Sequence, residues 1–189
     1  MEKWMQEIRQ YKPYNEQEEK DKALILTCMD AYDNLLTREN PVAHFSSSGF
    51  IVNKTRDKVL MIHHNIYNAW SWTGGHTDGE TDFLGVAIRE AKEETGVQEV
   101  KVLSEGILSL DVLPVPAHIK KGVYVSAHLH LSIAYLVEVD EEELLRVKPD
   151  ENSGVKWIAI EELDKYVDNE PDMLILYKKF LEKMKVYNL

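Results

Sequence analysis

Cysteine is almost absent from this chain of 189 residues, which contains Cys28 alone. A lone cysteine cannot form a disulfide within the chain, so reducing surroundings are the natural expectation. No apolar run approaches the roughly 20 residues that a membrane-spanning helix requires. The first residues are polar and lack the apolar stretch of a signal peptide. The sequence therefore predicts a cytoplasmic protein with no membrane partner.

Basic residues are also scarce: 22 Lys and Arg face 33 Asp and Glu, which gives a net charge of −11. This balance disfavours a broad electrostatic contact with a nucleic-acid backbone, so we expect no nucleic-acid partner. An acidic protein that handles phosphates must neutralise them locally, with a bound cation or a few placed basic side chains. Lys120 and Lys121 could meet phosphate from a loop, although adjacent lysines are usually solvated.

The chain divides into a helical N-terminal part and a longer mixed part. Apolar residues recur at helical spacing between Glu16 and Leu36, and Pro41 is expected to end this helix. Residues 1–41 are thus predicted to form a helical extension. It could cover a pocket, mediate a homodimer or simply pack on the back of the sheet. The remaining residues, 42–189, are predicted to form the main domain.

The main domain mixes strand-like and helical segments. Alternating, β-branched and aromatic residues predict strands over 44–53, 57–64, 69–72, part of 97–112, 123–139 and 155–160. Helices are predicted over 82–95 and from Pro171 onwards, the first followed by Gly96 at the usual position of a C-terminal glycine. This mixture predicts an α/β or α+β sandwich.

Three glutamates share one face of the helix predicted over 82–95. Glu90, Glu93 and Glu94 have the spacing i, i+3, i+4, so their carboxylates crowd beside the apolar stripe that buries the helix. Each like-charge pair costs roughly a few tenths of a kcal/mol on an exposed helix, and more in a groove with less water. A divalent cation relieves this repulsion, and oxygen ligands favour Mg²⁺ or Mn²⁺. A solvated acidic face is the alternative.

The neighbouring residues favour a metal site over a solvated face. Arg89 can pair with Glu93 one turn later and fix its rotamer. Gly74 and Gly75 allow a tight turn that brings a backbone carbonyl close to the helix and the metal. Together with Gly96, these features distinguish the segment from an ordinary acidic helix.

The segment Gly75–Val97 resembles the Nudix box, whose Arg-Glu-aliphatic-x-Glu-Glu-x-Gly-aliphatic block is matched in register from Arg89 onwards. The resemblance extends over about 42–167. It implies an α/β/α sandwich with a mixed central sheet, and Mg²⁺ held by Glu90, Glu94, Glu93 and the Gly75 carbonyl. It also implies hydrolysis of a nucleoside diphosphate linked to another moiety.

The resemblance leaves two features of the site open. Counting from Gly75 places Thr81 where the family has a glutamate, with Glu80 one residue earlier, so one outer carboxylate is expected to be missing and the number of metal ions stays open. For the general base, Glu93 is the first choice. Glu151, in an acidic loop, is the second choice, and a solvated loop acid is its simpler interpretation.

Histidines and one tryptophan are candidates for substrate binding. His128 and His130 alternate on one face of a strand, His44 begins a second polar row, and His76 directly follows the glycine turn. Structural histidines are the alternative, and a histidine metal site at His128 and His130 lacks a third ligand nearby in the sequence. Trp72 could stack on a base or anchor the core.

Two other functions share this fold. An isomerase of prenyl diphosphates would use a cysteine in its pocket, whereas Cys28 lies outside the matched core on an apolar helix face. A non-catalytic ligand sensor would not need the glutamate block, which is intact here. Hydrolysis is therefore the predicted activity.

Overall fold

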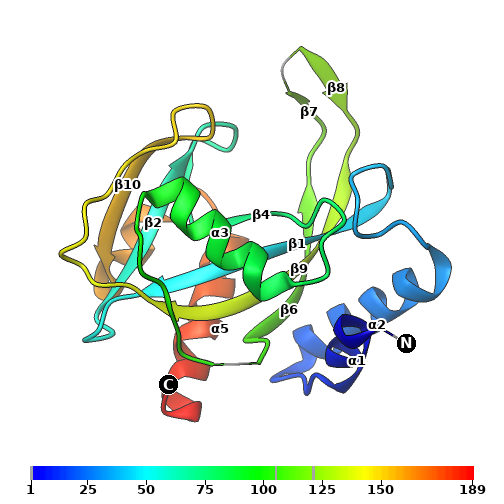
Figure 1. The fold of residues 1–189 in the computed structure, drawn as a ribbon, viewed down its shortest axis with the longest axis horizontal. Coiled ribbons are helices and arrows are strands. Elements are labelled where there is room, and N and C mark those ends of the chain that lie inside the picture. Colours follow the sequence, from blue (N-terminus) through cyan, green and yellow to red (C-terminus); the bar gives the residue numbers. More distant parts are fainter. Residues whose placement is uncertain (1, 105, 121) are drawn as a thin grey trace.

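A curled mixed sheet organises the computed structural model, which describes residues 2–104, 106–120 and 122–189 (Figure 1). The strand order is β10-β2-β1-β9-β5, with β3 paired to β2, β4 to β1 and β6 to β9. The central pair β1–β9 is parallel and the other pairs are antiparallel. The strands are β1 (Ala43–Val52), β2 (Lys58–His64), β3 (Ala69–Ser71), β4 (Thr73–His76), β5 (Lys101–Val102), β6 (Ser109–Val115), β9 (His128–Glu138) and β10 (Asn152–Ala159).

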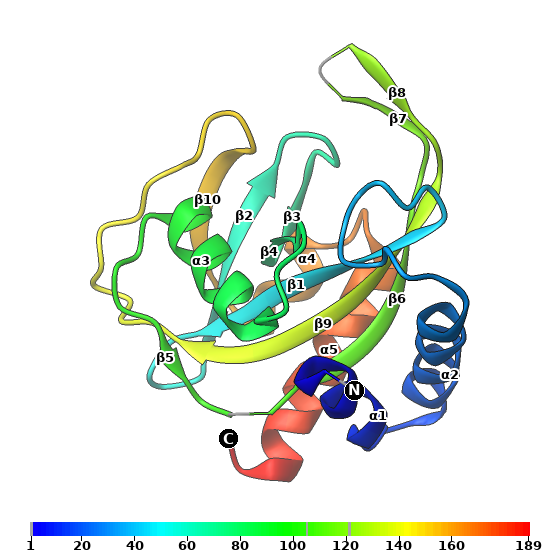
Figure 2. The same ribbon diagram turned by 45° about the vertical axis from the view of Figure 1, so that its right-hand side comes forward.

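Helices cover both faces of this sheet, which confirms the predicted sandwich (Figures 1 and 2). Helix α3 lies on one face and α5 on the other, while α1 and α2 lie beside β6. The hairpin β7–β8 projects beyond the sheet. These elements are α1 (Lys3–Gln10), α2 (Glu16–Ala31), α3 (Phe83–Thr95), η1 (Ile160–Glu162), α4 (Leu163–Tyr166), α5 (Pro171–Tyr187), β7 (His118–Lys120) and β8 (Val123–Val125). Within the described part of the chain, every helix is too short or too polar to cross a bilayer.

Local signals in the sequence account for the position of α3. The Asp82 side chain accepts a hydrogen bond from the Gly85 N–H, which caps the first turn. Gly96 ends the helix in the left-handed conformation, at φ 83°, as predicted. On β1, alternate side chains point to opposite faces: the Ser47 hydroxyl donates to the Phe83 carbonyl of α3, whereas Phe50 stacks on α5.

The structure corrects two predicted elements. The N-terminal helix ends at Ala31, well before Pro41, because the backbone becomes extended at Tyr32. Leu35 is nevertheless buried, because its loop packs on the sheet and its carbonyl accepts from the Phe45 N–H. This buried loop residue happens to continue the helical spacing of apolar residues, which made the predicted helix too long. The long strand predicted over 123–139 is interrupted between β8 and β9.

A buried ionic network ties the N-terminal helices to α5. Glu18 of α2 is fully buried and accepts hydrogen bonds from Lys183 at 2.8 Å and from the Tyr11 hydroxyl at 2.6 Å. Lys179 contacts both Glu18, at 3.2 Å, and Asp111 of β6. Two carboxylates and two ammonium groups thus offset one another away from water. The extension is packed against the sheet and α5, as one of the sequence alternatives expected.

Replacing Glu18 by Gln should destabilise the fold, because the mutation leaves two buried lysines without their shared carboxylate. We expect the free energy of unfolding, measured by urea denaturation, to fall by about 3–5 kcal/mol. The exposed neighbour Glu19 is the control, and Glu19→Gln should cost less than about 1 kcal/mol. Equal stability of the two variants would contradict the role given to the network.

The same contact predicts how stability depends on pH. Desolvation raises the pKa of Glu18, but hydrogen bonds from Lys183 and Tyr11 outweigh it and hold the pKa below the ordinary 4.5. A lowered folded-state pKa stabilises the protein above pH 4.5, and that stability is lost as the pH falls through the folded pKa. Below pH 4.5 the wild type should therefore lose stability more steeply than Glu18→Gln.

Candidate active site

The three glutamates of α3 differ sharply in exposure. Glu94 is 2% exposed and accepts a hydrogen bond from the Gly74 N–H at 2.9 Å. The side chains of Glu90 and Glu93 are 14% and 45% exposed. Burial raises the pKa of Glu94 to about 8 and, together with the charge of Glu93, raises the pKa of Glu90. Two of the three predicted ligands are therefore carboxylates held in surroundings that disfavour their charge.

The glycine turn lies directly against these carboxylates. Strand β4 runs antiparallel to β1, with Gly75 opposite Ser47 and Gly74 opposite Ser48. A side-chain carbon at Gly75 would lie 2.5 Å from the carboxyl carbon of Glu90. One at Gly74 would lie 2.9 Å from the Ser47 carbonyl oxygen and would overlap the Ser48 side chain. Only glycine lets the strand pass between β1 and α3 at this distance.

Arg89 contacts its predicted partner and two further glutamates. Its guanidinium lies 3.9 Å from Glu93, one turn later in α3, 3.5 Å from Glu90 and 2.5 Å from Glu80 of the preceding loop. Left-handed residues in the preceding turn, Asp78 and Gly79, allow the loop to direct Glu80 back to the helix. The glutamate one residue before Thr81 thus lies against α3 through its contact with Arg89.

Glu93 and Glu151, the two candidate bases, are joined by a lysine that the sequence analysis missed. The Lys148 ammonium lies 2.9 Å from Glu93 and 3.0 Å from Glu151. Desolvation lowers the pKa of Lys148, but the hydrogen bonds to both glutamates outweigh it and raise the pKa. The buried Asn152 side chain donates to the Glu94 carbonyl at 2.9 Å and anchors this loop to α3. The composition of this loop does not distinguish Lys148 and Asn152 from ordinary solvated loop residues.

Comparison with known proteins identifies the family to which this arrangement belongs. A model of the NUDIX domain matches residues 43–182. The chain belongs to the Nudix family. The resemblance predicted from the box at Gly75–Val97 is therefore confirmed.

Relatives support a hydrolase. An RNA pyrophosphohydrolase of Pelagibacter ubique is 32% identical, over 72% of this chain and 89% of the relative. A probable DHNTP pyrophosphohydrolase of Lactococcus lactis is 28% identical, over 55% of this chain and 59% of its own length. A C. elegans Ap4A hydrolase has a similar fold, with a TM-score of 0.55 and 19% identity, over 75% of this chain and 97% of that one. The Nudix protein described here is a hydrolase of phosphoanhydride bonds, and the isomerase and sensor alternatives lose their basis.

The predicted histidines of this Nudix hydrolase are brought together on the other face of the sheet. Ser47 faces α3, so the alternate residues of β1, including His44, point away from it. His44 lies opposite His130 in the parallel register, and its ring centroid is 5.0 Å from that of His76 and 4.7 Å from that of His128. Three strands thus contribute to one cluster that the sequence showed only as two separate polar rows.

Trp72 lies in the hydrophobic core rather than in an open pocket. It is 9% exposed, its ring stacks on Phe180 at 5.3 Å, and its backbone N–H donates to the Tyr177 hydroxyl. This packing corresponds to the core-anchor interpretation, and we do not assign Trp72 to substrate. Cys28 is also buried, among the apolar residues contributed by the N-terminal helices. Lys121 lies outside the described residues, and only the backbone of Lys120 is described.

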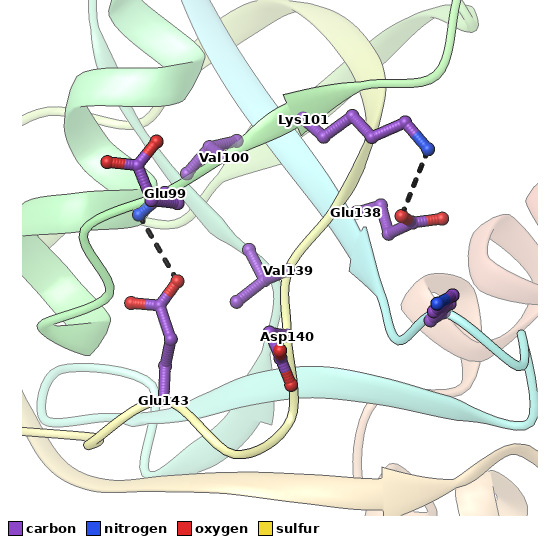
Figure 3. Close-up of a pocket in the computed structure, with 8 residues that line it drawn as sticks. Glu99, Val100, Lys101, Glu138, Val139, Asp140 and Glu143 are labelled. Atoms are coloured by element: carbon purple, nitrogen blue, oxygen red, sulfur yellow. Dashed lines mark hydrogen bonds and ion pairs between the residues drawn. The ribbon is translucent and has the colours of Figure 1, made fainter.

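A pocket of about 380 Å³ lies apart from the Nudix box (Figure 3). Lys101 lies 3.1 Å from Glu138 in its lining, and the Glu143 carboxylate accepts from the Glu99 backbone N–H at 3.2 Å. The predicted site residues do not contribute to its lining. We therefore place the candidate active site at α3 and β4.

The two glycines should respond differently to alanine substitution. In Gly75→Ala the new methyl group meets the flexible end of Glu90, so stability should change by less than about 1 kcal/mol. Displacement of the carboxylate should lower turnover at least about 10-fold. In Gly74→Ala the methyl group meets the rigid Ser47 carbonyl, and unfolding free energy should fall by about 1–3 kcal/mol. Urea denaturation and a turnover assay measure the two effects.

Gly106→Ala is the matched control, because its nearest neighbour, the Ser104 hydroxyl, is 4.0 Å away. It should change neither quantity substantially. Full turnover in Gly75→Ala would show that the close contact with Glu90 does not matter for activity.

Proposed function

We propose that this Nudix hydrolase depends on Mg²⁺ and cleaves the diphosphate bond of a nucleoside diphosphate linked to another moiety. One observation carries the proposal. Glu90 and Glu94, one helical turn apart, are withdrawn from water beside a glycine turn that leaves space for no side chain. Two carboxylates in such surroundings repel each other unless a cation or a proton intervenes.

The donor set suits a hard divalent cation. Nudix enzymes generally use a divalent metal, and Glu90, Glu94, Glu93 and the Gly75 carbonyl would offer it oxygen atoms only, which favours Mg²⁺ and admits Mn²⁺. When bound, the ion would polarise the phosphoryl group and acidify a water molecule. All these residues lie within 42–189, which we propose as the catalytic domain, with 1–41 as a helical extension.

The protein's own residues supply positioning and a base. Arg89 bridges Glu80 and Glu90, so it holds the loop before α3 against the ligand carboxylate. Glu93 and Glu151 are the two candidates for accepting the proton of the attacking water. Both carboxylates form ion pairs with Lys148. One of them can therefore act as the base while the other neutralises the lysine ammonium.

Relatives indicate the range of substrates to test. Their names refer to RNA, to DHNTP and to Ap4A, which share a phosphoanhydride next to a nucleoside or pterin. The net charge of −11 still argues against a long nucleic-acid contact, but an RNA end would need only local neutralisation. We therefore favour small nucleoside diphosphate derivatives and retain 5′-triphosphorylated RNA as a comparison.

A substrate panel tests the proposal. Nucleoside triphosphates, dinucleoside polyphosphates, nucleoside diphosphate sugars and 5′-triphosphorylated RNA are incubated with and without Mg²⁺, and the products are identified. We expect Mg²⁺-dependent cleavage of at least one small nucleoside derivative, reduced at least about 100-fold in Glu94→Gln because a ligand oxygen is lost. The exposed Glu161→Gln is the control and should retain activity. Full activity in Glu94→Gln would refute the assigned role.

The identity of the base is tested by comparing Glu93→Gln with Glu151→Gln. Loss of the base should reduce kcat about 10²–10⁴-fold and remove the acidic limb of the pH–rate profile, because that limb reports protonation of the base. The other variant should keep the limb, since it leaves the base in place. If both variants keep the limb, neither residue is the base.

A further inference from the structure

The histidine cluster is formed by the topology of the sheet. His44 of β1 lies opposite His130 of β9 in the parallel register. His76 of β4 lies opposite Ser46, the next residue of β1 on the same face as His44. A nitrogen atom from each of the three imidazoles lies within 4.8 Å of the other two. Three strands thus bring three nitrogen donors to one point.

The hydrogen bond of His44 determines which of its nitrogens can bind a ligand. The Nδ1 atom lies 3.3 Å from the Asn40 carbonyl oxygen, which can only accept, so Nδ1 carries the proton. The Nε2 atom therefore presents a lone pair. His44 is 4% exposed, and within the described residues its Nε2 has no hydrogen-bond partner. A buried polar atom of this kind is costly and requires an explanation.

The second observation is the spacing of the other two rings. The Nε2 atoms of His76 and His130 lie 3.2 Å apart. Two nitrogen ligands of a tetrahedral Zn²⁺, each at about 2.0–2.1 Å, lie about 3.3 Å from one another. Metal-binding histidines usually donate their other ring N–H to a carbonyl or carboxylate, which fixes the ring orientation. The hydrogen bond from His44 Nδ1 to the Asn40 carbonyl has this form.

We propose that His44, His76 and His130 bind a divalent transition-metal ion, with Zn²⁺ as the leading candidate, at a site distinct from the glutamates of α3. Imidazole nitrogens favour Zn²⁺ over Mg²⁺, whereas the carboxylates have the opposite preference. His128 is the nearest candidate for a fourth ligand, with its ring centroid 4.7 Å from that of His44 and its Nδ1 bonded to the Ser126 carbonyl. The two sites share β4, since Gly75 faces Glu90 and His76 faces the histidines.

The proton position of His44 also favours a metal over a phosphate as the ligand. A nitrogen lone pair binds a metal ion, whereas an anion needs an N–H donor. Because Nδ1 of His44 carries the proton, its Nε2 presents a lone pair and no donor.

Cobalt binding tests the proposal without reference to catalysis. The full chain is stripped with EDTA, titrated with Co²⁺ and followed by visible absorption, and bound Co²⁺ is then displaced with Zn²⁺. We expect one equivalent of Co²⁺ with the intense bands of tetrahedral nitrogen coordination. His44→Ala and His76→Gln should each weaken binding at least about 100-fold, beyond the usual effect of an outer-shell change. Circular dichroism establishes that each variant is folded.

Two controls separate this site from others. His118→Ala removes a partly exposed histidine of the β7–β8 hairpin and should leave the bands unchanged. Glu94→Gln should also keep them, whether or not the protein hydrolyses any member of the substrate panel. The proposal is overturned if folded His44→Ala and His76→Gln both bind Co²⁺ as the wild type does, or if Glu94→Gln removes the bands. It is equally overturned if inorganic phosphate, and not Co²⁺, shifts the histidine NMR signals.

Discussion

Strand β4 lies in contact with both β1 and α3, and the rest of the site depends on this close approach. Side chains at Gly74 and Gly75 would meet Ser47 and Ser48 on one side and Glu90 on the other. Their absence lets the Gly74 N–H reach Glu94 and keeps water away from the carboxylates. The next residue of β4, His76, points to the opposite face of the sheet, away from α3. One backbone segment therefore positions both groups of candidate ligands.

The protein buries carboxylates at more than one point. Glu94 is buried and accepts a hydrogen bond from the Gly74 N–H, but burial outweighs this bond and disfavours the charged form of its carboxylate. Glu18, equally buried, is held charged by Lys179 and Lys183. The contrast shows two uses of a buried carboxylate. Lysine side chains of the protein neutralise Glu18, whereas we propose that a cation from solution neutralises the carboxylates of α3.

The sequence predicted the local parts of the site well. Helical register alone placed Glu90 and Glu94 on one face, and Asp82 and Gly96 mark the two ends of α3 as observed. The i+4 pair of Arg89 with Glu93 is observed, but the shorter contact of Arg89 with Glu80 was missed, because it depends on the turn before the helix. The N-terminal helix was predicted too long, since burial of a loop residue has the same spacing as a helix.

The sequence by itself determined the family, the helix that carries the three glutamates and the class of reaction, because these depend on residues within one continuous segment whose spacing along the helix sets their geometry. Only the tertiary structure decided which distant residues join them. Lys148 contacts both Glu93 of α3 and Glu151 of its own loop, and His44, His76 and His130 meet through strand pairing. The parallel pair β1–β9 joins segments far apart in the chain through a long crossover connection, so no single local segment shows which residues it brings together.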